Sequence, residues 1–306
     1  MFRRLVVAAA AVLALTSGAL AREMTSVYVV TAVANKQGWL GTDWHTDLTL
    51  YNPHNKVLYV KLAFLPTGQD NSAGVPTAPP IDLQPWETLN LWDVIGPNGF
   101  NARGQTGALL VYADVDLNSC PGTKGDTSCD FAVFARNYTL NPLGGGGEFG
   151  QDFPGFPANL GLEYGFIAYL PQLIDDQEFI TSIGAASWTA SWVTARVDLQ
   201  ETDGTIVNHY ELLIPPYGHV QGRIPVGLKG GTAAVYVVDG PNDSAVYPYA
   251  TVRSAITGDP TTIEAQISTV GLSAQAASLR PAVLRSRPPA VAVPGFSVPR
   301  LKHRGE

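Results

Sequence analysis

The sequence has 306 residues, a formal net charge of −7, 45% hydrophobic residues and two cysteines. This length and apolar content are sufficient for the core of one large domain or two ordinary ones. Residues 22–279 carry 25 acidic against 11 basic residues, and such a negative body argues against nucleic acid as a partner, because it would repel phosphates.

The first segment in chain order is a predicted signal peptide, residues 1–21. A pair of arginines precedes the apolar run of residues 5–15, and Ala19-Leu20-Ala21 follows. This is the order of a secretory signal, and the run is shorter than the about 20 apolar residues that span a bilayer. We therefore expect a secreted or extracytoplasmic protein, periplasmic or at the cell surface, with no transmembrane segment in the mature chain. An uncleaved anchor helix is the alternative.

Alternating apolar residues predict half-buried antiparallel strands, and the alternation recurs 135 residues later. The first set is Leu58, Val60, Leu62 and Phe64, and the second is Val193, Ala195, Val197 and Leu199. The strands that precede them match as well, with Leu48 against Ile183. Proline-aromatic corners at 83–89 and 214–220 also match, as do strands at 107–114 and 232–239 and at 131–136 and 247–253. Five landmarks in one order indicate an internal repeat.

The predicted fold is therefore all-β: two tandem, internally related antiparallel β-sandwich (Ig-like) domains at residues 22–142 and 161–265. Alternation in unrelated sandwich strands is the competing explanation of the likeness. Residues 143–160 are rich in glycine and phenylalanine and predict an interdomain loop whose Phe149, Phe153 and Phe156 pack between the domains. Residues 266–306, rich in alanine, proline and arginine, predict a disordered basic tail.

Cys120 and Cys129 bracket a short polar segment and predict a disulfide in an exported chain. Asp114 and Arg136 are 22 residues apart, whereas their predicted counterparts Asp239 and Arg253 are 14 apart. The bridge therefore closes an insertion of eight residues in the first copy. A metal pair or a redox dithiol is the less favoured alternative, because the C-x-x-C spacing is absent.

Three sets of residues are candidates for chemistry. His45 and Asp47 would share one face of a strand, where the carboxylate could orient the imidazole as an acid-base pair, although no nucleophile motif accompanies them. Asp114, Asp116 and Asn118 alternate like the start of a calcium loop, although the later positions of an EF-hand are missing. Apart from calcium, no cofactor is expected.

The third set consists of first-domain tryptophans that could stack on glycan or pack in the core: Trp39, Trp44, Trp86 and Trp92. Arg136 and Arg253 occupy matching places in the predicted repeat, and each is interpreted as half of a structural ion pair.

The segment Trp44-His45-Thr46-Asp47-Leu48-Thr49-Leu50-Tyr51-Asn52-Pro53, followed by the corner Leu83-Gln84-Pro85-Trp86-Glu87-Thr88, resembles a domain of exported bacterial proteins of unknown function. Those proteins carry a W-x-T-D-L-x-L-x-N-P strand and an L-x-P-G-E-T corner, in which Trp86 here replaces the usual glycine. The resemblance implies a β-sandwich and export, and it implies no catalytic residues.

Two hypotheses of function follow. The favoured one is a non-enzymatic surface, matrix or adhesion-type protein that makes contacts with other envelope or extracellular proteins, its basic tail reaching an anionic surface. The alternative is a secreted glycan-binding module, less favourably a hydrolase, that uses the first-domain aromatic residues. Edge strands of sandwiches can also pair with other chains, so the oligomeric state is left open.

Overall fold

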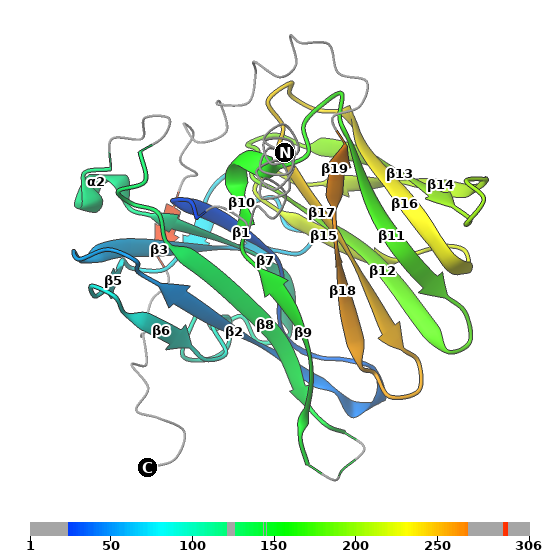
Figure 1. The fold of residues 1–306 in the computed structure, drawn as a ribbon, viewed down its shortest axis with the longest axis horizontal. Helices are drawn as coiled ribbons and strands as arrows, with labels where there is room; N and C mark the ends of the chain where they lie inside the picture. Colours follow the sequence, from blue (N-terminus) through cyan, green and yellow to red (C-terminus); the bar gives the residue numbers. More distant parts are fainter. Residues whose placement is uncertain (1–23, 121–125, 143, 145, 269–289, 293–306) are drawn as a thin grey trace, which may run out of the picture.

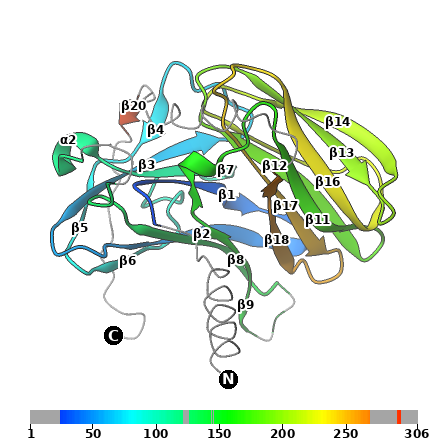
Figure 2. The ribbon, with the colours of Figure 1, turned by 45° about the horizontal axis from the view of Figure 1, so that its top comes forward.

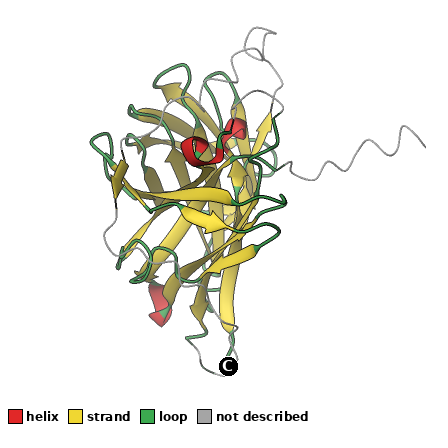
Figure 3. Cartoon of the chain, turned by 90° about the vertical axis from the view of Figure 1, so that its left-hand side faces the viewer, coloured by secondary structure: helices red, strands yellow, loops and turns green. Residues whose placement is uncertain are grey.

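The computed structural model describes residues 24–120, 126–142, 144, 146–268 and 290–292 (Figure 1). Nearly all of its elements are antiparallel strands, and the described helix is confined to α2 (Val115–Asn118) and the 3-10 turns η1 (Trp39–Gly41) and η2 (Ala158–Leu160) (Figure 3). This confirms the predicted all-β class. The predicted signal peptide and most of the predicted tail lie outside the described residues. In the described part, no helix has the length and apolar character that crossing a membrane requires.

The first half of the chain forms two layers of strands. They are β1 (Val27–Gln37), β2 (Asp43–Tyr51), β3 (Leu58–Pro66), β4 (Val75–Thr77), β5 (Ile81–Leu83), β6 (Thr88–Leu91), β7 (Gln105–Ala113), β8 (Ala132–Leu140), β9 (Glu148–Pro154) and β10 (Phe156–Pro157). One layer pairs in the order β5-β3-β7-β1-β10 and the other in the order β6-β2-β8-β9. The end of β1 also pairs with the start of β2, which joins the two layers into one sheet.

The second half repeats this order of pairing. Its strands are β11 (Ile167–Asp175), β12 (Phe179–Ser187), β13 (Val193–Gln200), β14 (Ile206–Ile214), β15 (His219–Arg223), β16 (Leu228–Asp239), β17 (Val246–Ser254), β18 (Pro260–Glu264) and β19 (Gln266–Ser268). They form the sheets β14-β13-β16-β11-β19 and β15-β12-β17-β18. Apart from β4, each first-half strand has a counterpart in the same chain order, and the pairings match except for that of β1 with β2, which has no second-half equivalent.

The two proline-aromatic corners have the same backbone geometry. Trp86 and Tyr217 both lie in the left-handed region, at φ 60° and 44°. The N–H of Trp86 donates to the carbonyl of His54, and that of Tyr217 donates to the carbonyl of Thr189, which is 135 residues further on. The structure thus gives the two corners the same turn.

The predicted alignment of β7 with β16 was one residue out of register. Ala108 lies opposite Leu65, and Thr232 lies opposite Gln200, so Gly231 and not Thr232 is the counterpart of Gly107. A bulge in the pairing of β16 with β13 adds the extra residue. Neither glycine has room for a Cβ, which would lie 2.3 Å from a β3 carbonyl at Gly107 and 2.2 Å from a β13 carbonyl at Gly231.

Each half encloses its own apolar core, and the predicted alternating residues are in these cores. Leu58, Val60, Leu62 and Phe64 belong to the first core, and Val193, Ala195, Val197 and Leu199 to the second. A third cluster lies where the halves meet, with Val29, Leu65 and Leu110 on one side and Trp188 and Tyr247 on the other (Figure 2). The layer of β3, β7 and β1 is thus covered on both faces.

The predicted interdomain loop is mostly strand. Residues 148–154 form β9, which pairs with the edge strand β8, and β10 pairs with β1. Two of its phenylalanines do pack against the second half: Phe153 meets Tyr249 edge-on at 5.7 Å between ring centroids, and Phe156 meets Tyr247 at 6.0 Å.

Two parts of the predicted tail are also strands. Residues 266–268 form β19, so the second half extends three residues beyond its predicted end. Residues 290–292 form β20 (Ala290–Ala292), which pairs in parallel with β4 of the first half.

Candidate functional site

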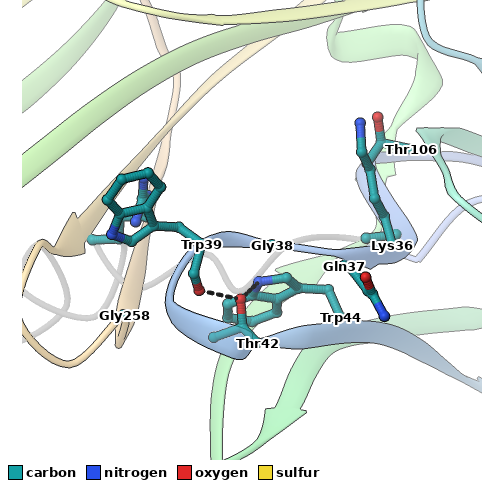
Figure 4. Close-up of a pocket in the computed structure, with 10 residues that line it drawn as sticks. Lys36, Gln37, Gly38, Trp39, Thr42, Trp44, Thr106 and Gly258 are labelled. Atoms are coloured by element: carbon teal, nitrogen blue, oxygen red, sulfur yellow. Dashed lines mark hydrogen bonds between the residues drawn. The ribbon is translucent and has the colours of Figure 1, made fainter. Parts of the chain in front are cut away.

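A tight turn between β1 and β2 holds Trp39 and Trp44 (Figure 4). The Gly38 N–H donates to the carbonyl of Thr42 at 2.8 Å, and the Thr42 hydroxyl donates to the carbonyl of Trp39, also at 2.8 Å. The indole Nε1 of Trp44 donates to the same hydroxyl at 3.0 Å. The polar edge of the Trp44 ring is therefore satisfied within the turn.

This turn has a strained backbone and is tightly packed. Leu40 adopts φ 59°, a left-handed conformation that is unfavourable for a leucine, and Gly41 follows at φ 77°. A Cβ on Gly38 would lie 2.7 Å from Nε1 of Trp44, so only glycine fits against the ring. Strained backbone of this kind persists where the surrounding structure imposes it, and it is common at binding sites.

The turn borders a groove of about 270 Å³ between the two halves (Figure 4). From the first half, Lys36, Trp39, Trp44 and Thr106 line it, and the second half contributes Arg253 of β17 and Gly258. Trp39 is 63% exposed although it is the largest type of apolar side chain. An aromatic side chain that is exposed to solvent in this way is available to contact a ligand.

Arg253 is half-buried in this groove, and in the described part of the chain no carboxylate lies within ion-pair distance of it. The nearby carboxylate of Asp175 is engaged by both Nε and Nη2 of Arg223, at 3.1 and 2.6 Å. Burial lowers the pKa of Arg253, and the Arg223 guanidinium lowers it further. An arginine nevertheless stays charged at neutral pH, so the groove contains a fixed positive charge.

A second, larger cleft of about 600 Å³ lies beside the same turn and shares Lys36 and Gln37 with the groove. His45 is central to its polar wall: Nδ1 lies 3.2 Å from Asp93, and Nε2 lies 3.5 Å from Asp43. The amide of Asn35 donates to both oxygens of Asp93 at 2.9 Å. Carboxylates of the protein thus lie near both imidazole nitrogens and fix the orientation of the ring.

The predicted pair of His45 and Asp47 does not act as a direct unit. Asp47 accepts the backbone N–H of Asp93 at 2.9 Å, and Asp93 in turn meets His45. The carboxylate that orients the imidazole is thus supplied by the segment after β6, and Asp47 positions that segment. The alternation that placed both residues on one face of β2 could not reveal this third residue.

The four predicted tryptophans do not form one platform. Trp39 and Trp44 line the groove together. Trp86 is 61% exposed, but it lies at the β5–β6 corner, near the opposite end of β2, where Tyr51 pairs with Thr88. Trp92 is half-buried after β6. The glycan interpretation therefore narrows to Trp39 and Trp44.

Two of the three residues of the predicted calcium loop, Asp114 and Asn118, hold parts of the fold together. Oδ1 of Asp114 caps α2 by accepting the N–H groups of Asp116 and Leu117, and its carboxylate pairs with Lys61. Burial opposes ionisation of Asp114, but Lys61 and these N–H groups hold its pKa below the usual range. The Asn118 oxygen accepts the N–H of Tyr59. These oxygens are occupied, and no three His, Cys, Asp or Glu residues in the described part are grouped to hold a metal.

The predicted disulfide between Cys120 and Cys129 is present. Cys129 is buried, and Cys120 packs against the first core beside it. The bridge therefore attaches the base of the inserted segment to the core. Residues 121–125, which lie between the two cysteines, are outside the described part.

The two arginines have different roles. Arg136 forms the predicted ion pair, with Glu148 at 2.8 Å. Arg253 is not its counterpart, because Arg253 lies opposite Ile180, and the first-half residue in that place is Tyr138, opposite His45. Aligning Arg136 with Arg253 is therefore wrong by two residues, and it led to the prediction of an ion pair where Arg253 lines the groove.

The sequence did not identify Asn35, Lys36 and Asp93 as residues of the site. For Asp93, a difference in segment length between the two halves could have done so. Leu91 and Gly107 are separated by 16 positions, whereas their counterparts Gly222 and Gly231 are separated by nine. The first half therefore has a second insertion, of seven residues, and Asp93 and Arg103 of the cleft lie in it.

No protein-family model matches the chain, and no curated protein matches its sequence.

Proposed function

We propose that this chain is an exported, non-enzymatic binding protein of the cell surface, envelope or surrounding matrix, and that it binds glycan in the groove between its halves. The observation that carries the proposal is the strained turn that holds Trp39 exposed beside Trp44. Trp86 is equally exposed on a left-handed backbone, so exposure alone does not select the site. Trp39 differs because it lies in a groove beside a second indole and polar side chains, and that combination favours binding.

Sugar rings suit these side chains physically. One face of a pyranose presents C–H groups, which pack against the electron-rich face of an indole, while the hydroxyls remain free for polar partners. The groove supplies such partners in Thr106, Gln37 and Lys36. The larger cleft next to it adds Asn35, Asp43 and Asp93. Their carboxylates can accept hydrogen bonds from further sugar hydroxyls, and the amide can also donate them.

The finer architecture is part of the same proposal. We infer two tandem copies of one Ig-like sandwich behind a cleaved signal peptide. The shared order of strand pairing and the matching corners at Trp86 and Tyr217 support the duplication. The disulfide between Cys120 and Cys129 is compatible with an oxidising, extracytoplasmic setting. We keep the proposal that the basic tail reaches an anionic surface, for the residues beyond β19.

The glycan proposal predicts binding that depends on two of the tryptophans. On a glycan array followed by titration calorimetry, Trp39→Ala and Trp44→Ala should each weaken binding by about 1–2 kcal/mol, roughly tenfold in Kd, because each removes a stacking face. Trp86→Ala is the matched control, since it removes an equally exposed indole away from the groove. No binding by the unmutated protein to any glycan would end the proposal, and so would equal loss in all three variants.

A second candidate function is protein contact, which the sequence favoured in general terms, and we propose the edge strand β14 as the surface and a second copy of this chain as the partner. β14 ends its sheet, and Ile206, Val207 and Leu213 on it are exposed. An unpaired, apolar edge can pair with the same edge of a second copy.

This candidate predicts self-association that a charge on the edge abolishes. Light scattering over a concentration series should show a dimer for the unmutated protein and a monomer for Leu213→Lys, because a charged side chain on the edge opposes pairing. Leu140→Lys, at the exposed end of β8, is the control. A protein that stays monomeric at every concentration would contradict this use of β14.

A further inference from the structure

We infer that the groove selects an anionic saccharide, and specifically one that carries carboxylate groups, through Arg253. This inference rests on the proposed glycan binding and names the class of ligand. It starts from the distribution of charge, because the body of the protein is strongly acidic and the groove is not. Its charged lining residues are Lys36 and Arg253, with no carboxylate among them.

Four of the nine described basic residues before the tail are already engaged in ion pairs. In the described part, Lys61, Arg136, Arg196 and Arg223 form ion pairs with carboxylates. Of the other described basic residues before the tail, Lys36, Arg103 and Arg253 line the groove and the adjoining cleft, whereas Lys56 and Lys229 do not. Three of the five described basic residues without an ion pair thus lie around one turn, in a chain whose overall charge is −7, and the cleft beside that turn also holds Asp43 and Asp93.

Arg253 is the residue best placed to select a charge. Its guanidinium is half-buried and comes from the second half, while the tryptophans come from the first. A ligand that reaches it must therefore lie across the junction of the halves. Asp175 acts on Arg253 only from a distance, because Arg223 engages its carboxylate. No carboxylate of the described residues is within ion-pair distance of Arg253, and an anionic ligand would supply one.

We choose carboxylate as the ligand group because a uronic acid carries it directly on the sugar ring, next to the ring face that the indoles would contact. The planar guanidinium presents two parallel N–H groups that match the two oxygens of a carboxylate. The groove also holds two indoles that can pack against the face of a sugar ring. It therefore fits a uronic acid, whose ring would contact Trp39 and Trp44 while Arg253 holds its carboxylate. Lys36 contributes charge without this geometric preference.

The test compares three polymers and four variants of the full exported protein by titration calorimetry. Polygalacturonate carries carboxylates, its methyl ester has the same backbone without the charge, and dextran sulfate carries sulfates. We expect polygalacturonate to bind at least tenfold more tightly than either of the others, with binding that weakens as salt is added. Arg253→Gln should remove this preference, and Arg253→Lys should restore it only in part, because lysine keeps the charge and loses the fork.

Lys36→Gln should weaken polygalacturonate binding by a smaller factor, and Lys229→Gln, which removes an exposed lysine of β16 outside the groove, should leave it unchanged. A thermal melt of each variant verifies that the fold is intact. Equal binding of polygalacturonate and its methyl ester, or tighter binding of dextran sulfate, would overturn the carboxylate assignment. If neutral glycans bind through Trp39 while Arg253→Gln changes nothing, this inference fails and the proposed function survives. If no glycan binds, both fail.

Discussion

The free energy of unfolding should fall steadily as the pH is lowered from 6.5 towards 4.5, because a neutral histidine is buried where the two halves meet. His219 is fully buried, with Nδ1 2.7 Å from the hydroxyl of Thr67 and Nε2 2.8 Å from that of Tyr249. Both partners are uncharged hydroxyls, and burial lowers the pKa of His219 to about 3.

The sign follows from which state binds the proton. In the unfolded chain, this histidine takes up a proton near pH 6.5, whereas in the folded protein it stays neutral down to about pH 3. Acid therefore favours the unfolded state by about 1.4 kcal/mol per pH unit in this window. Between pH 7 and 4.5, His219 alone should remove roughly 3 kcal/mol. Carboxylates with lowered pKa values, such as Asp114, act only at lower pH.

Urea unfolding at several pH values measures this effect. His219→Gln keeps a donor and an acceptor for Thr67 and Tyr249 but cannot titrate, so its stability should change much less between pH 7 and 4.5. His209→Gln, an exposed histidine of β14, should keep the pH dependence of the unmutated protein. The same slope in all three proteins would show that His219 does not control acid stability.

His219 also shows why the contact between the halves could not be predicted. Thr67 and His219 are 152 residues apart, yet they form an isolated bridge and a hydrogen bond. The sequence predicted strands from local alternation, and alternation reports only that one face of a strand is buried. It could not show that Leu65 and Leu110, on the opposite face, would be covered by Trp188 and Tyr247.

The candidate site was accessible from the sequence only in part, for the same reason. Trp39 and Trp44 were identified because tryptophan is rare and large, but Arg253 joins them from 214 positions away in the chain. The calcium interpretation was based on spacing alone. Alternate oxygens also suit the cap of a short helix, and that is how Asp114 is used. The glycine-rich segment became β9 because pairing with the edge of β8 outweighed its low strand propensity.

Asn52 is the motif residue whose loss should cost the most stability. Its side chain is fully buried, and its amide donates to the carbonyls of Lys56, Leu83 and Gln84 at 2.7, 3.0 and 3.0 Å. Its oxygen accepts the N–H of His54 at 2.9 Å. One amide thus joins the end of β2 to the corner that begins at β5.

Asn52→Ala should therefore lower the free energy of unfolding by about 3–5 kcal/mol, because one buried and three partly buried backbone groups lose their partner at once. Asn90 of β6 has an exposed amide whose oxygen accepts a hydrogen bond from the Thr49 hydroxyl of β2. Asn90→Ala should lower the free energy of unfolding by less than about 0.5 kcal/mol. Chemical unfolding of the two variants measures both values. A loss below about 1 kcal/mol in Asn52→Ala would mean that water or local rearrangement replaces the bonds.

The same reasoning gives the W-x-T-D-L-x-L-x-N-P segment a physical role without catalysis. The Thr46 hydroxyl accepts the N–H of Ala34 and donates to Asn137, and Asp47 holds the segment that carries Asp93. Trp44 is the motif residue that the fold leaves at the groove. If Asn52→Ala lowers stability while the protein that remains folded binds ligand with unchanged affinity, the motif divides into an architectural part from Thr46 to Asn52 and a ligand-binding part at Trp44.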